Sequence, residues 1–113
     1  METDKVRILE ACLGQPQDLA GFVSYGSDAV ISKTLLDKPT GTLTLFAFDA
    51  GQGLSEHTSP YDAVVQVLDG KAIITINGQE MEVLAGQLIV MPANVPHALA
   101  AKEPFKMLLT MIR

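Results

Sequence analysis

The chain contains two histidines, His57 and His97, and imidazole is the side chain best suited to bind metal ions or exchange protons near neutral pH. His57 lies in the stretch GQGLSEHTSPYDA, residues 51–63, together with the polar side chains of Ser59 and Tyr61. On a strand Ser59 shares the face of His57, because successive side chains alternate between faces. Tyr61 lies in the following turn, from which it could fold inward. We therefore take His57, Ser59, Tyr61 and His97 as candidate ligand-binding residues, and His57 and His97 as candidate metal ligands.

Other side chains that support catalysis lack partners at a suitable spacing. Glu56 directly precedes His57, so that on a strand it points to the opposite face. Apart from Glu56 and Asp62, no two carboxylates stand at a spacing that brings them together for general acid and base catalysis. Cys12 has no neighbouring histidine to activate it as a nucleophile. The sequence therefore identifies no catalytic residue.

Composition limits the classes of protein and partner. A chain of 113 residues, with 48% hydrophobic and 19% charged residues, is typical of one folded domain. The net charge of −5, with scattered Lys and Arg, argues against nucleic acid as a partner. No hydrophobic segment reaches membrane length and no basic amphipathic face appears, so no membrane partner is expected. Cys12 is the only cysteine and no signal-peptide pattern is present, which leads us to expect a cytoplasmic protein.

The elements that must position the histidines are short β-type runs separated by turn residues. Their spacing of roughly 8 to 12 residues favours a sandwich or barrel over βαβ units. The Asn77-Gly78 pair predicts a tight hairpin, because both central residues of a type I′ turn need positive φ. The expected runs are residues 28–36, 42–50, 63–70, 71–77, 79–85, 87–92, 97–101 and 104–112.

We expect residues 28–113 to form the barrel and residues 1–27 to form an N-terminal arm or edge segment. The stretch VRILEACL, residues 6–13, fits two helical turns or a strand about equally well. At the other end of the chain, residues 105–112 alternate but carry apolar residues on both faces. Two apolar faces indicate burial against a second sheet or a partner subunit.

Several fixed intervals around the histidines resemble those of the cupin family. The first cupin motif, G(x)5HxH(x)3E(x)6G, matches at Gly51, His57 and Gly70. The second, G(x)5PxG(x)2H(x)3N, matches at the three positions Gly86, Pro92 and His97. The resemblance spans about residues 40–112 and implies a jelly-roll barrel of two antiparallel sheets. It also implies a homodimer.

The resemblance is incomplete at the positions that bind metal in this family. Cupins with complete motifs bind one divalent metal through both histidines and the glutamate of the first motif and the histidine of the second. Here Ser59 and Ala63 stand at the second histidine and at the glutamate. In the second motif, Asn94 replaces the turn glycine and Ala101 the terminal asparagine. Asn tolerates a left-handed backbone, so we expect the turn to persist.

Two functions remain open. In the first, the protein binds a small molecule in the barrel through His57, His97 and Ser59, performs no reaction and has no complete metal centre. In the second, it is a metal-dependent oxygenase or isomerase that holds a divalent metal loosely on the two histidines. Both require the two rings to lie within contact or one-ligand distance, on neighbouring strands. The sequence does not identify the ligand, the metal or the reaction.

Aromatic and thioether side chains share strand faces near these positions. Phe46 and Phe48 form one such group, and Met107, Leu109 and Met111 form another. They can line an apolar ligand cavity, since flexible thioethers suit an irregular one, or they can form the ordinary packed core.

Overall fold

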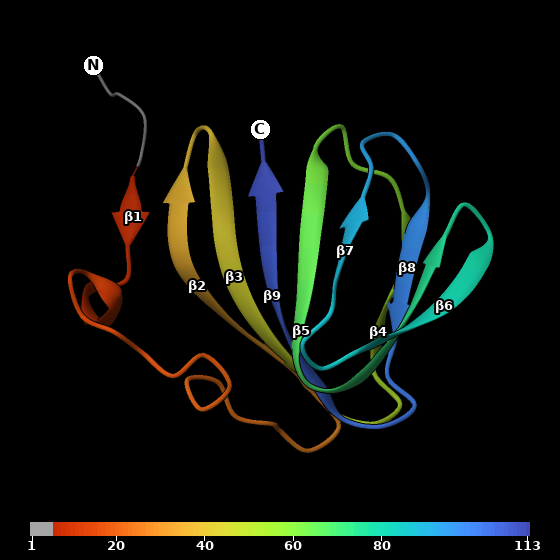
Figure 1. The fold of residues 1–113 in the computed structure, drawn as a ribbon, viewed down its shortest axis with the longest axis horizontal. Coiled ribbons are helices and arrows are strands. Elements are labelled where there is room, and N and C mark those ends of the chain that lie inside the picture. Colours follow the sequence, from red (N-terminus) through yellow and green to blue (C-terminus); the bar gives the residue numbers. More distant parts are fainter. Residues whose placement is uncertain (1–5) are drawn as a thin grey trace.

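The computed structural model describes residues 6–113, and Figure 1 shows that strands dominate them. The all-β prediction is therefore confirmed. No helix within this range is long and apolar enough to cross a membrane. The elements are β1 (Arg7–Ile8), the 3₁₀ turn η1 (Glu10–Cys12), β2 (Val30–Lys38), β3 (Gly41–Phe48), β4 (Gly53–His57), β5 (Asp62–Ile76), β6 (Gln79–Leu84), β7 (Leu88–Met91), β8 (His97–Ala100) and β9 (Phe105–Ile112).

The strands form two antiparallel sheets that share β5 and enclose a jelly-roll barrel. The first sheet has the order β1-β2-β3-β9-β5-β7. The second has the order β6-β5-β8-β4. Because β4 and β8 are neighbours, the second sheet brings both histidines to one place.

A single long strand, β5, replaces the two runs expected at residues 63–70 and 71–77. Its first half pairs with β7 and β9, and its second half pairs with β6 and β8. Between the halves, a register shift follows Val67 and Gly70 adopts a φ of 72°. These irregularities bend the strand enough for it to belong to both sheets.

Strand β4 was not among the expected runs, because Gly53, Ser55 and Glu56 give it little β propensity. Residues 53–57 nevertheless form a strand, because they pair with β8. The hairpin at Asn77-Gly78 is confirmed, with φ of 51° and 81° at the two residues. The turn before β8 persists as expected, since Asn94 adopts a φ of 65°.

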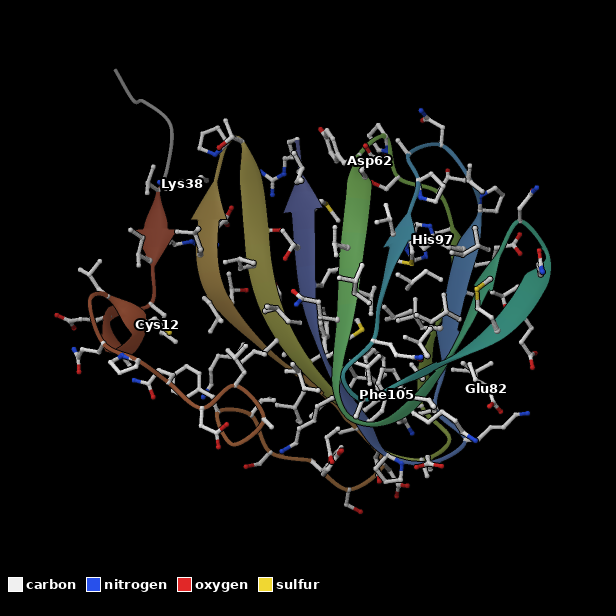
Figure 2. All side chains as sticks on the ribbon, viewed as in Figure 1. Cys12, Lys38, Asp62, Glu82, His97 and Phe105 are labelled. Carbon is white, nitrogen blue, oxygen red and sulfur yellow. The ribbon has the colours of Figure 1, made fainter. Side chains whose placement is uncertain are left out.

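The main core lies between the two sheets. Phe48 and Phe105 are fully buried there and stack with ring centroids 4.5 Å apart. Met107 and Val65, from adjacent strands, are also fully enclosed. Figure 2 shows Phe105 at the end of the barrel opposite Asp62. The aromatic pair therefore closes one end of the barrel, and the other end is left for a pocket.

The outer face of the first sheet carries a second apolar cluster, which the N-terminal segment covers. This arrangement explains the two apolar faces of β9, since Leu108 on its outer face packs against the chain's own N-terminal residues. Neither a second sheet nor a partner is needed at that position. The cluster consists of Val23, Leu35, Leu45 and Ala47, with Leu9, Cys12, Leu19, Phe22, Leu43, Leu68 and Leu108 packed around them.

Two lysines fix this N-terminal segment on the sheet. Lys33 donates to the carbonyl oxygen of Phe22 at 2.5 Å and lies 4.1 Å from the centre of its ring. Lys106 donates to the carbonyl oxygen of Ala20 at 2.5 Å. In Figure 1 the segment runs from β1 past the lower ends of β2 and β3. Residues 6–13 form a short edge strand followed by one 3₁₀ turn, instead of the two helical turns or the single strand that the sequence suggested.

Candidate functional site

His57 and His97 lie directly opposite each other on the neighbouring strands β4 and β8. Their Nε2 atoms are 3.1 Å apart, and the ring centroids are 4.4 Å apart with an angle of 72° between the planes. The expectation that the two rings meet is confirmed. The cupin intervals from Gly51 to His57 and from Gly86 to His97 indicated this meeting of the rings. His57 is the last residue of β4 and His97 is the first residue of β8, and these two ends pair with each other.

The other nitrogen of each ring faces a backbone carbonyl. His57 Nδ1 lies 2.7 Å from the oxygen of Ser55, and His97 Nδ1 lies 3.2 Å from the oxygen of Val95. A carbonyl oxygen only accepts hydrogen bonds, so each Nδ1 carries the proton and donates. In the neutral pair both Nε2 atoms therefore present lone pairs to each other. Two acceptors this close require a positive charge or a donor between them.

The two histidines differ in exposure. His97 has 5% of its surface exposed, whereas His57 is exposed at the mouth of the barrel. Burial lowers the pKa of His97 below its usual value, and the neighbouring His57 lowers it further, although the Val95 carbonyl acts in the opposite direction. Burial disfavours the imidazolium form because it removes water from the charge. His97 therefore favours its neutral form, which is the form that can accept a ligand.

A pocket of about 50 Å³ lies beside the two rings, between the sheets. In Figure 2, His97 lies between β7 and β8, nearer the end of the barrel marked by Asp62 than the end closed by Phe105. The polar lining consists of His57, His97 and Ser59. The apolar lining consists of Leu54, Ala63, Met91, Leu99, Met107, Leu109 and Met111. Met107, Leu109 and Met111 therefore line the pocket, and the first two also belong to the main core or pack against it.

Ser59 and Tyr61 take different positions. Ser59 lines the pocket, and its hydroxyl accepts a hydrogen bond from the backbone N–H of Tyr61 at 3.2 Å. Asn94 donates its backbone N–H to the Ser59 carbonyl at 2.7 Å, which ties together the two loops at the mouth. Tyr61 is 38% exposed and does not line the pocket. The structure therefore brings Ser59 to the histidines but leaves Tyr61 outside.

Among residues 6–113, no carboxylate replaces the missing glutamate of the metal motif. Ala63 occupies that position, buried on the inner face of β5. The neighbouring Asp62 accepts a hydrogen bond from the backbone N–H of Ala93 at 2.8 Å. Within residues 6–113, no three His, Cys, Asp or Glu side chains gather as potential metal ligands. Zinc sites with catalytic function use three protein ligands, so the two imidazoles do not fit the complete metal centre of the family.

Besides Ala63, which the sequence identified only as the replaced glutamate position, three lining residues were absent from the candidates, namely Leu54, Met91 and Leu99. Met91 could have been found by alternation, because LIVM in β7 places Ile89 and Met91 on the inner face. Leu54 gave no such signal, since its strand was not recognised. Leu99 pairs with Leu54, so its place in the pocket depended on the same unrecognised strand.

Comparison with known proteins agrees with this architecture. The sequence model of the cupin domain family matches residues 44–112, which cover β4 to β9 and the second part of β3. Among proteins with curated descriptions, none matches the chain significantly.

Several solved structures are similar to the chain over most of its length. A conserved protein of unknown function from Streptococcus pyogenes is 40% identical, with a TM-score of 0.87 over 96% of this chain and 93% of the other. A cupin superfamily protein from Desulfitobacterium hafniense is 28% identical, with a TM-score of 0.87 over 94% and 97%. A cupin 2 conserved barrel domain protein from Leptotrichia buccalis is 41% identical, with a TM-score of 0.81 over 84% of this chain and 46% of the other.

Proposed function

Because the chain belongs to the cupin family, we propose that it is a binding cupin, which holds a small ligand on His57 and His97 and performs no reaction there. The observation that carries this proposal is the pair of Nε2 atoms, 3.1 Å apart beside the pocket, on two rings whose Nδ1 atoms both face carbonyl oxygens. Folds do not specify reactions, so the proposal depends on this pair and on the side chains around it.

The pocket defines the chemistry of the ligand. Two imidazole acceptors favour a positively charged group or a group with hydrogen-bond donors. The Ser59 hydroxyl can donate or accept a further hydrogen bond beside them. The remaining lining is aliphatic or thioether, so any other part of the ligand must be apolar. We therefore expect a small cationic or donor-bearing ligand rather than an anion.

The size of the pocket sets a second limit. Typical pockets for drug-sized ligands measure about 300–1,000 Å³, whereas this pocket measures about 50 Å³. A ligand of only a few non-hydrogen atoms fits without movement of the side chains. A larger apolar part would require the methionines to change rotamer, which their unbranched side chains allow.

An NMR titration of the two histidine rings tests this function. We would add ethylammonium or formate, matched in size and opposite in charge, at about pH 8, where free imidazoles are neutral. Ethylammonium is expected to shift the ring signals to saturation, and formate to leave them unchanged. Equal responses to both ions, or none to ethylammonium, would contradict the proposal.

Two variants control this titration. His97→Phe removes one acceptor and keeps a ring in the pocket, so the shifts of His57 should become much smaller. Glu80→Gln changes an exposed side chain on β6 and should behave like the wild type. A response that survives in His97→Phe would place the ligand elsewhere.

A divalent metal on His57 and His97, used in an oxygenase or isomerase reaction, is the second candidate. It is favoured by the Nδ1 hydrogen bonds to backbone carbonyls, since histidines that bind metals usually donate their other N–H in this way. The absence of a carboxylate beside them weighs against it. We therefore rank it below the binding function.

Elemental analysis of tag-free protein separates the two candidates. We expect much less than one divalent metal ion per chain, because two imidazoles leave most of the coordination shell to water. Ala63→Glu restores the missing carboxylate and should increase stabilisation by Zn²⁺ in thermal unfolding. A full complement of divalent metal in the wild type would favour the enzyme.

A further inference from the structure

We infer that the ligand of His57 and His97 is a soft monovalent metal ion, Cu(I), and that the thioethers of Met91 and Met111 complete its coordination. This inference rests on the proposed binding role of the two histidines and specifies their ligand.

The two methionines flank the position where the carboxylate is missing. Ala63 pairs with Met91 on β7 and with Met111 on β9, so the three side chains form one row on the inner face of the first sheet. All three line the pocket that the histidines line from the second sheet. The short Ala63 side chain leaves space between two long thioethers. The metal motif has therefore lost a hard oxygen ligand at a place where two soft sulfur atoms are available.

The histidines already have the spacing of two ligands of one ion. Two nitrogen atoms bound to a metal at about 2.0 Å lie about 3.3 Å apart at a tetrahedral angle. The observed separation of the Nε2 atoms is 3.1 Å. Both atoms are free of protons in the neutral pair, because each Nδ1 donates to a carbonyl oxygen. A cation bound by both Nε2 atoms would therefore remove the repulsion between their lone pairs, and the rings would need to move little.

The four proposed ligands are two imidazoles and two thioethers, and their charge and softness determine which ion they prefer. All four are neutral, so a divalent ion would keep its full charge in a mainly apolar pocket. The cost of removing an ion from water rises with the square of its charge, which makes this penalty much smaller for a monovalent ion. Thioethers prefer Cu(I), whereas Mg²⁺, Ca²⁺ and Mn²⁺ prefer oxygen ligands. Cu(I), a soft monovalent ion, satisfies both conditions.

Anaerobic titration of the metal-free protein with Cu(I), in competition with bicinchoninate, tests the inference. The wild type should bind one Cu(I) per chain, and X-ray absorption should show both nitrogen and sulfur neighbours of the copper. The double variant Met91→Leu with Met111→Leu should lose the sulfur contribution and at least about tenfold in affinity. Met81→Leu, on β6 and outside this pocket, should match the wild type.

The variants also separate failure of the inference from failure of the proposed function. A wild type that binds ethylammonium but not Cu(I) would overturn the inference and leave the binding function intact. A double variant that binds Cu(I) as tightly as the wild type would overturn the role of the thioethers. If His97→Phe binds both Cu(I) and ethylammonium like the wild type, both proposals fail.

Leu is close to Met in volume, so each substitution should cost less than about 1.5 kcal/mol. If the double variant does not fold, the single variants provide the test, since each should lose one sulfur neighbour. Single variants with unchanged sulfur neighbours would contradict the assignment.

Discussion

His57 and His97 share one register position, yet their environments differ. His97 is enclosed between the sheets, whereas His57 remains exposed at the mouth. Backbone carbonyls at Ser55 and Val95 fix the same tautomer in both rings. The pair therefore combines a buried imidazole with an accessible one, so the ligand that we propose would enter past His57 to reach His97.

The pKa of His97 should make the stability of the apo protein depend on pH. Burial lowers this pKa in the folded state, while the unfolded chain keeps a value of about 6.5. Between the two values the unfolded chain binds more protons, so the free energy of unfolding should fall as the pH drops below about 6.5 and through the lowered pKa. Urea unfolding across this range, with NMR titration of the His97 ring, measures the effect.

The variant His97→Phe provides the control for this pH dependence, because it should remove the part of the slope that comes from His97. A His97 ring that titrates at or above the usual histidine value would contradict the prediction.

At the scale of elements, a glycine with positive φ lies where β5 passes from one sheet to the other. Gly70 has a φ of 72°, and a Cβ atom there would collide with the backbone carbonyl oxygen of Pro104. Gly78, in the β5–β6 hairpin, has a φ of 81° but faces open space. An alanine would therefore be strained by the positive φ at both positions, but it would collide with a neighbouring segment only at position 70.

Gly78→Ala should lower the free energy of unfolding by about 1–2 kcal/mol, the cost of a left-handed backbone in a residue with a Cβ atom. Gly70→Ala should lower it by about 1–3 kcal/mol more, because the strand or the Pro104 segment must move. Urea denaturation of both variants tests the difference. Equal losses would show that the close approach at Gly70 contributes nothing to stability.

At the scale of the whole molecule, the outer face of the first sheet is divided. The N-terminal segment covers the part formed by β2, β3 and Leu108. The part near β7 exposes Leu88, Val90 and Ile112, at 59%, 50% and 59%. The apolar character of β9 is thus partly explained within one chain. A smaller apolar surface remains available to a second copy.

The homodimer implied by the family resemblance stays a prediction, and this exposed surface is where we expect it to form. Light scattering should give a dimer for the wild type and a monomer for the double variant Leu88→Lys with Val90→Lys. Leu84→Lys, at a 47% exposed residue on β6, is the matched control and should remain a dimer. A monomeric wild type would contradict the prediction.

The sequence alone determined the parts of this protein that depend on local pattern. Alternating apolar residues predicted most of the strands, and Asn77-Gly78 predicted the hairpin. The fixed intervals from Gly51 to His57 and from Gly86 to His97 predicted the barrel and the meeting of the two rings.

Only the tertiary structure decided which residues surround those rings. Met91 and Met111 lie 20 residues apart in the chain and share a row only because β7 and β9 both pair with β5. The inward position of Ser59, the exposure of Tyr61 and the carbonyl partners of both imidazoles depend on loop conformation. Neighbours across a sheet follow from strand order and register, which are set by contacts between distant segments and not by the residues of any one strand.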